Sequence, residues 1–253
     1  MARAKKHDIE VAAEALSQAS NKRIQVVLST SDIHLKYKFN IGRNEAREIT
    51  QEMVEYAASF GCEVEFAAED ATRTDTDFLI DIFKIAVDAG ASIVEIPDTV
   101  GYASPAEYGE LVSSVCKALP DDIIISTHCH NDLGLAVANT LAGIASGAKQ
   151  AEVTINGIGE RAGNASLEEV VMNLDTRKDL YKIDTDIETK HLLSASQLVS
   201  HLSGMSIQKN KAIVGDNAFL HESGIHQHGM LKNKDTYQIM DPEKIGWAGN
   251  QMI

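Results

Sequence analysis

The fold is decided by the stretch Val87-Asp-Ala-Gly90-Ala-Ser-Ile-Val94, in which a helix ends, a glycine follows and a strand begins. The same order recurs in residues 56–66 around Gly61 and in residues 144–153 around Gly147. Glycine suits this position because helices commonly end on a left-handed residue, where a side chain would clash. The repeat predicts helices that each lead directly into a strand.

Short apolar runs mark the strands themselves. They begin near residues 24, 64, 93, 123 and 152, and helical patterns separate them at a spacing of roughly 30 residues. The run Ile123-Ile-Ile125 is continuously apolar, as strands of a parallel sheet usually are. We therefore expect an α/β fold with five parallel strands, preceded by a helix over about residues 7–18.

The length of the chain, 253 residues, is close to the roughly 250 residues of a complete (β/α)8 TIM barrel. The five strands, however, lie within residues 1–182, and residues 183–253 are helical and then rich in glycine, histidine and asparagine. We expect a partial TIM barrel over 1–182, with about five of the eight strands, from the C-terminal part of the barrel. A mostly helical linker or subdomain is expected over 183–253. About three strands, on the order of 90 residues, would precede Met1 in the intact protein.

Composition and charge exclude several classes of protein. Hydrophobic residues make up 44% and charged residues 24%, which is ordinary for a globular chain. The net charge of −14 argues against nucleic acid or an anionic membrane as a partner. No stretch approaches the roughly 18 apolar residues of a membrane span. The three cysteines, Cys62, Cys116 and Cys129, are widely spaced, which fits a reducing compartment. We expect a cytoplasmic protein that binds small molecules.

Polar side chains collect where the predicted strands end. They lie in the segments Ser29–Asp32, Glu69-Asp70, Asp98-Thr99, His128–Asp132 and Asn156–Asn164. In parallel α/β folds the ligand site lies at the C-terminal ends of the strands. Carboxylates, imidazoles or hydroxyls at five consecutive strand ends therefore predict one convergent site.

His128 and His130 are the candidate metal ligands. In a strand, residues i and i+2 share a face about 7 Å apart, so two imidazoles can approach one cation. Cys129 between them is then expected to face the helices and to pack there. Asn164 could add an oxygen ligand, and with carboxylate and water the set would suit Mg²⁺, Mn²⁺ or Zn²⁺. The alternative interpretation is two histidines held in loop hydrogen bonds.

A second motif, Gly157-Ile-Gly159-Glu-Arg-Ala162, fits the pattern of a dinucleotide-binding turn. That turn belongs to the first βα unit of its fold, whereas here it follows the last strand. The next strand should end in an acidic residue, but Tyr181-Lys-Ile183 before Asp184 is a poor strand. Glu160 and Arg161 would also place charges against the pyrophosphate. We therefore disfavour a nicotinamide cofactor.

Several long motifs resemble the α-isopropylmalate/homocitrate synthase family. They are Ser31–Lys38, Glu69–Arg73, Ile96–Tyr102, His128–Ala136, Asn156–Val170 and Gly215–Gln227. The resemblance covers the chain from about Asp8. It implies a TIM barrel, a helical subdomain and a C-terminal regulatory domain, in an acyltransferase that condenses acetyl-CoA with a 2-oxo acid on a divalent metal. Within the family, the motifs most resemble those of members that use 2-oxoisovalerate as the 2-oxo acid, which gives 2-isopropylmalate in leucine biosynthesis. Homocitrate-type or citramalate-type specificity is the nearest alternative.

The resemblance also implies roles for individual residues. Glu69, His226 and Tyr237 match catalytic positions, Thr99 and Gln25 match substrate-binding positions, and His128, His130 and Asn164 match the metal site. His226 is the expected base that takes a proton from the acetyl methyl group, with Glu69 assisting. In this family the subdomain reaches into the barrel of a partner subunit, so the resemblance implies a homodimer.

The chain departs from the family's pattern in several places. No segment matches the Asp-Thr-Thr-Leu-Arg-Asp-Gly-type first strand, which supplies a metal carboxylate and a catalytic arginine. Gln25 stands where many relatives carry histidine, Ala67-Ala68 replace Ser-Pro, and His228 replaces an aspartate. We also expect this chain to lack the family's regulatory domain. We therefore keep a second hypothesis, that the chain is a non-catalytic fragment, truncated at both ends, which binds metal weakly and self-associates through its open edges.

Overall fold

The computed structural model describes residues 1–247 of the chain. Two compact units are present. The first, here called the barrel unit, holds residues 1–152 together with 160–164. The second, here called the C-terminal unit, holds residues 153–159 and the chain from residue 165 onward. The domain boundary expected at residue 182 stays a prediction.

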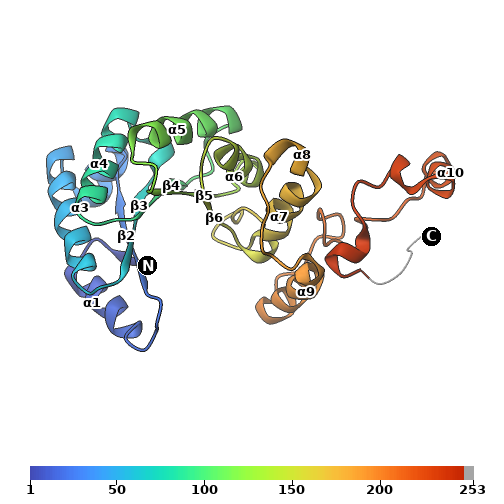
Figure 1. The fold of residues 1–253 in the computed structure, drawn as a ribbon, viewed down its shortest axis with the longest axis horizontal. Coiled ribbons are helices and arrows are strands. Elements are labelled where there is room, and N and C mark those ends of the chain that lie inside the picture. The colour runs from blue at the N-terminus through green and yellow to red at the C-terminus, as the bar shows by residue number, and fades with distance from the viewer. Residues whose placement is uncertain (248–253) are drawn as a thin grey trace. The chain divides into compact units, whose positions relative to one another are not determined.

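The barrel unit is built on one parallel sheet whose six strands follow one another in chain order (Figure 1). The strands are β1 (Ala2–Arg3), β2 (Arg23–Ser29), β3 (Glu63–Glu69), β4 (Ile93–Asp98), β5 (Ile124–Cys129) and β6 (Gln150–Glu152). The predicted partial barrel is confirmed, with one correction to the count of five. The extra strand is β1, whose two residues are too short to show any sequence period. Within residues 1–247, β1 pairs only with β2 and β6 only with β5, so the sheet is open.

Helices cover one face of this sheet, and Figure 1 shows α3, α4 and α5 side by side along it. The helices of the barrel unit are α1 (Lys6–Ala15), α2 (Asp32–His34), α3 (Arg43–Ala58), α4 (Thr76–Asp88), α5 (Pro105–Ala118) and α6 (Ala136–Ala145). The glycines that end the helices before β3, β4 and β6 have positive φ values of 67°, 111° and 117° at Gly61, Gly90 and Gly147. The predicted helix–glycine–strand repeat is therefore confirmed.

The two faces of the sheet differ in chemistry because side chains alternate along a strand. Phe66 of β3 points to the helices and meets Phe83 of α4 edge to face, with ring centroids 6.3 Å apart. Cys129 is fully buried on the same side, beside Tyr108 of α5 and Thr140 of α6. Its expected packing against the helices is confirmed. The neighbours of these residues in sequence, Glu65 among them, therefore point to the other face, which is polar.

The C-terminal unit has a small apolar core of its own. Its helices are α7 (Leu167–Thr176), α8 (Lys178–Tyr181), α9 (Leu192–Ser203) and α10 (Gly224–Lys232), and it contains no strand among its described residues. The core consists of Val171, Met172, Leu192, Leu193, Ile213, Val214 and Ile245. The expectation of a mostly helical second part is therefore confirmed. None of the helices within residues 1–247 is both long enough and apolar enough to cross a membrane.

Candidate active site

His128 and His130 meet at the C-terminal end of β5. Their Nε2 atoms lie 3.3 Å apart, and the Nδ2 atom of Asn164 lies 3.2 Å from Nε2 of His128. Backbone pairing brings Asn164 there, since it forms an isolated β-bridge with His130 and the Asn131 N–H donates to the Gly163 carbonyl at 2.9 Å. The structure thus brings together the three residues expected at the metal site.

The donor set of these three residues fits a divalent cation. Metal–nitrogen bonds of about 2.0–2.1 Å at a tetrahedral angle place two ligand nitrogens roughly 3.4 Å apart, close to the separation of the two imidazoles. Burial, and after it the neighbouring His128, lower the pKa of His130, which favours the neutral ring that metals bind. Turning the Asn164 amide by 180° presents its oxygen in place of its nitrogen.

The other nitrogen of His128 faces two glutamates. Its Nδ1 atom is 3.0 Å from Oε2 of Glu152 and 4.0 Å from Oε1 of Glu95. Ligand atoms of these three residues all lie within 4.8 Å of one another, which is also a spacing that could hold a cation. Burial, and then the charge of Glu152, raise the pKa of Glu95 well above its ordinary value.

These two glutamates were missed in the sequence for different reasons. Glu95 lies inside β4, whereas Glu152 ends β6, a strand that was expected to begin near residue 152. Glu95 stands between Val94 and Ile96 in an apolar run, and only 3% of its surface is exposed. A charged residue in a buried parallel strand is the signal that could have singled it out, because an unpaired buried charge is costly. Glu152 gave the weaker signal, since β6 is only three residues long.

Gln25 joins the same polar network. Its amide nitrogen donates to Glu95 and, at 3.1 Å, to Oε1 of Glu152. A second part of the network lies beside it, where Gln150 donates to Glu65 at 3.0 Å. Burial, and then the charge of Glu152, raise the pKa of Glu65 to about 7. The role of Gln25 in substrate binding stays a prediction.

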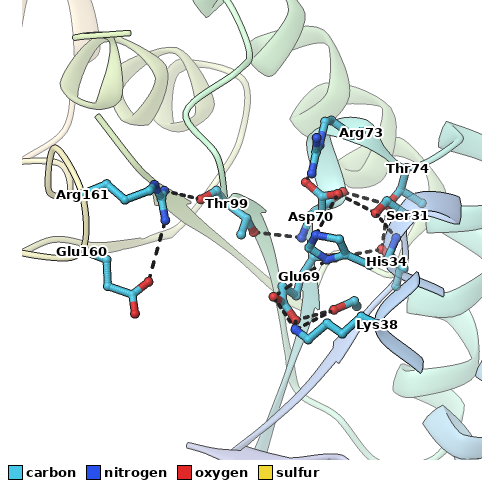
Figure 2. A network of polar contacts seen from close by, with 12 residues as sticks. Ser31, His34, Lys38, Glu69, Asp70, Arg73, Thr74, Thr99, Glu160 and Arg161 are labelled. Atoms are coloured by element: carbon cyan, nitrogen blue, oxygen red, sulfur yellow. Dashed lines mark hydrogen bonds and ion pairs between the residues drawn. The ribbon is translucent and has the colours of Figure 1, made fainter. Parts of the chain in front are cut away.

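Glu69 lies at the end of β3 and is held by an adjacent segment of the chain (Figure 2). Nζ of Lys38 donates to its two carboxylate oxygens at 2.7 and 2.6 Å, and the Ser29 hydroxyl also donates to it. Burial opposes ionisation of Glu69, but the hydrogen bonds from Lys38 and Ser29 outweigh it and lower the pKa of the carboxyl group. Nδ1 of His34 lies 3.9 Å from the same carboxylate.

Lys38 was not singled out in the sequence, because a lysine in a helical segment is ordinarily a solvated surface residue. It is carried by a π-helical turn over Leu35–Phe39, and such turns are frequent at functional sites. The turn ends at Asn40, whose φ of 57° is left-handed. This local winding brings Lys38 back over the strand ends.

Thr99, which follows β4, links Asp70 at the end of β3 to Arg161 in the loop after β6, as Figure 2 shows. Its hydroxyl oxygen accepts the Asp70 N–H at 2.8 Å, and its carbonyl accepts from Nη2 of Arg161 at 2.6 Å. Arg161 also forms two hydrogen bonds with the Asp132 carboxylate, at 2.8 and 3.0 Å. The hydroxyl hydrogen of Thr99 can be donated to a ligand.

His226 and Tyr237 come together within the C-terminal unit. Their rings stack with centroids 4.1 Å apart and planes 27° apart, and His221 lies edge-on to His226 at 5.7 Å. His226 is carried by α10, none of whose residues is buried. The catalytic roles expected for His226 and Tyr237 stay predictions.

Comparison with known proteins identifies relatives of the whole chain. Residues 1–199 match the HMGL-like family, and residues 213–253 match the family described as homocitrate synthase post-HMGL domain-like. The chain is 56% identical, over 97% of its length, to 2-isopropylmalate synthase 1 of Caldanaerobacter subterraneus subsp. tengcongensis, of which it covers 62%. It is 51% identical, over its whole length, to 2-isopropylmalate synthase of Pyrococcus abyssi, of which it covers 52%.

The chain thus spans about half the length of the curated relatives it matches. Among solved structures, HMG-CoA lyase of Bacillus subtilis superimposes with a TM-score of 0.66 at 20% identity, covering 77% of this chain and 68% of that one. At this identity the likeness concerns the fold alone. The match of the family over residues 1–199 and the curated relatives agree, and the chain belongs to the HMGL-like family.

Proposed function

We propose that this chain carries the catalytic barrel of a 2-isopropylmalate synthase, an acyltransferase that condenses acetyl-CoA with 2-oxoisovalerate in leucine biosynthesis. The observation that carries the proposal is the convergence of His128, His130 and Asn164 at the strand ends, in a chain 56% identical to a protein of that name. A cytoplasmic location and a homodimer, both expected from the sequence, are part of this proposal.

In this proposal the strand ends bind and orient the 2-oxo acid. His128, His130 and Asn164 would hold Mg²⁺, Mn²⁺ or Zn²⁺, which when bound supplies a Lewis acid for the carbonyl group. Thr99 donates its hydroxyl hydrogen to the substrate carboxylate, and its position is fixed by Asp70 and Arg161. Holding the substrate in one orientation lowers the entropic part of the barrier.

Glu69 and His226 have different roles in the removal of the proton from the acetyl methyl group. Glu69 is ionised, but its lowered pKa makes it a weak base, so its role is to assist and to fix the geometry. His226 takes the proton from the acetyl methyl group, and the stacked ring of Tyr237 holds the imidazole in place. The methyl carbon then forms the bond to the 2-oxo carbon, while the π electrons of the carbonyl group move to its oxygen, which takes up a proton. Hydrolysis by water breaks the C–S bond of the thioester and releases CoA as the thiol.

One observation favours the second hypothesis, that the isolated chain is a non-catalytic fragment. Within the described residues the sheet has two open edges, at β1 and β6, whereas a TIM barrel closes its sheet. An open barrel leaves the strand ends exposed to water on one side, which weakens electrostatic stabilisation. We therefore expect the isolated chain to bind metal more weakly than the intact protein, and to catalyse the condensation slowly or not at all.

The test uses the intact protein and the isolated chain side by side. Both are given acetyl-CoA, a divalent metal and one 2-oxo acid at a time (2-oxoisovalerate, 2-oxoglutarate or pyruvate), and released CoA thiol is measured. The proposal expects 2-oxoisovalerate to be used best by the intact protein and His128→Ala to abolish both turnover and metal binding. If His128→Ala leaves metal binding and turnover unchanged, the proposal fails.

A further inference from the structure

We propose that Glu152 is a positioning residue that selects the tautomer of His128. By accepting the Nδ1–H, its carboxylate leaves the lone pair of the ring on Nε2, the atom that faces His130 and Asn164. The inference rests on the proposed function, because that function makes His128 a metal ligand. It assigns a role to a glutamate for which the sequence motifs gave none.

The strand register places the two residues beside each other. His128 of β5 pairs with Glu152 of β6, so the two side chains stand next to each other on the polar face. Oε2 of Glu152 is 3.0 Å from Nδ1 of His128, a hydrogen-bonding distance. The other oxygen, Oε1, accepts from Gln25 at 3.1 Å, and Gln25 also donates to Glu95. Donors on both oxygens therefore hold the carboxylate in one orientation.

The surroundings of the ring determine where its hydrogen goes. A neutral imidazole has one N–H and one lone pair. The Nδ1 side of His128 faces a carboxylate, an acceptor without a hydrogen to give, whereas the Nε2 side faces Nε2 of His130 and the amide of Asn164. The N–H therefore belongs on Nδ1. Metal-binding histidines commonly donate their other N–H to a carboxylate in this way, which fixes the tautomer and the ring orientation.

The alternative arrangement is a cation held by Glu95, His128 and Glu152 themselves. It would need the lone pair on Nδ1, and the cation would lie where the Gln25 amide now donates to both glutamates. It would also turn an N–H of His128 towards His130, leaving the 3.3 Å pair of Nε2 atoms without a shared cation. The geometry favours the carboxylate as a partner of the ring and not as a ligand.

The two interpretations predict different effects of substitution. Glu152→Ala removes the acceptor of the Nδ1–H, so the His128 ring is free to rotate, and the affinity for metal should fall by about 10–100-fold. Glu152→Gln keeps an oxygen that accepts the Nδ1–H, so most of the affinity should remain. Were Glu152 itself a ligand, the loss of its charge in Glu152→Gln would cost as much as Glu152→Ala. Glu55→Ala, which removes an exposed glutamate of α3 whose carboxylate accepts a hydrogen bond from Gln51, is the control for charge.

The experiment titrates Mn²⁺ and Zn²⁺ into the chain against a chromophoric chelator, for the unmodified protein and the variants Glu152→Ala, Glu152→Gln, Glu55→Ala and His128→Ala. The expected order is near-unmodified affinity for Glu55→Ala, a small loss for Glu152→Gln, and large losses for Glu152→Ala and His128→Ala. Equal losses in Glu152→Gln and Glu152→Ala overturn the inference, as does an unmodified affinity in Glu152→Ala while His128→Ala loses metal. If His128→Ala also binds normally, the proposed metal site fails instead.

A second measurement needs no variant of Glu152 that folds. Long-range ¹H–¹⁵N spectra of the unmodified, metal-free chain, labelled at histidine, distinguish the two neutral tautomers of each ring. The His128 signal is identified by its loss in His128→Gln. Hydrogen on Nδ1 is expected, and hydrogen on Nε2 would overturn the inference whatever the variants show.

Discussion

The carboxylate of Glu69 accepts hydrogen bonds on both oxygens from Nζ of Lys38, at 2.7 and 2.6 Å. The pair joins the end of β3 to the π-helical turn over Leu35–Phe39, and Ser29 completes it. Lys38 thereby keeps Glu69 ionised in spite of its burial. Glu69, which is expected to assist in proton transfer, is thus held as an anion by Lys38, a residue to which no role was assigned from the sequence.

Replacing this lysine should change the titration of the carboxyl group. In Lys38→Met we expect the pKa of Glu69 to rise, because burial then acts without the compensating ammonium group. A depressed pKa stabilises the fold above the unfolded-state value and loses this effect as pH falls, so the variant should lose stability at neutral pH and less in acid. Lys38 is half exposed, which limits the loss to about 1 kcal/mol. Carboxyl ¹³C NMR titration and urea unfolding measure both effects.

Lys36→Met is the matched control, because it removes a lysine from the same turn. The ammonium group of Lys36 lies over the ring of Tyr37, 5.0 Å from its centroid. This variant should leave the Glu69 titration unchanged. Equal shifts in the two variants would show that general charge, and not the contact between Lys38 and Glu69, sets the pKa.

Glu65 should make stability depend on pH in the opposite direction from Glu69, because its pKa is raised and not lowered. Its pKa is raised to about 7, so between the unfolded value near 4.5 and about 7 the folded state binds more protons than the unfolded chain. Stability must therefore fall as pH rises through this window. Glu65→Gln keeps the acceptor for Gln150 and removes the titration, so stability above pH 7 should increase, by on the order of 2 kcal/mol. Urea unfolding between pH 4.5 and 8 measures the difference.

The control for this variant is Glu63→Gln. Glu63 lies two residues earlier in β3 and pairs with the same arginine, Arg23, but it is exposed. Its removal should change stability by less than about 1 kcal/mol and leave the pH dependence unaltered. If Glu65→Gln is no more stable than the unmodified chain at pH 8, the burial of an ionised carboxylate at this position is not a cost to the fold.

Much of the fold could be predicted because strong local signals agree with it. The glycines at 61, 90 and 147 each end a helix, and a strand begins two or three residues after each of them. What escaped prediction was β1, whose two residues are defined only by pairing with Val26 and Val27 of β2. A strand of two residues that is defined only by its pairing is too short to show a hydrophobic period in the sequence.

The candidate site divides in a similar way. Residues at strand ends, such as His128 and Glu69, were found because the topology brings strand ends together. Partners that depend on side-chain reach or on register were not: Lys38 arrives through a π-helical turn, and Glu152 through its pairing with His128. Sequence spacing cannot indicate these contacts, since they join segments 24 and 31 residues apart.

Cys129 lies between the two candidate metal ligands but should be chemically inert. It is fully buried, and burial raises the pKa of its thiol to about 12, so almost no thiolate is present at pH 8. Cys62, which is partly exposed, should react with iodoacetamide first. Peptide mass spectrometry after timed alkylation checks this order, with urea-unfolded protein as the reference in which both react. Modification of Cys129 as fast as Cys62 in the folded chain would show that β5 opens.

Arg161 should control the position of Asn164, three residues further along the chain. Its guanidinium group bonds to Asp132 and to the Thr99 carbonyl, so it ties the segment 160–164 to the ends of β4 and β5. Arg161→Lys keeps the charge but loses the planar fork, and we expect a loss of about 0.5–1 kcal/mol in stability and several-fold weaker Mn²⁺ binding. Arg177→Lys, which breaks a similar but exposed fork with Asp179, should change neither quantity. The charge of Arg161 acts on His130, but Arg161→Lys keeps that charge, and the hydrogen bonds of the guanidinium group go to Asp132 and Thr99. Weaker metal binding in Arg161→Lys alone would therefore reflect the placement of Asn164, and unaltered binding would show that the β-bridge with His130 suffices.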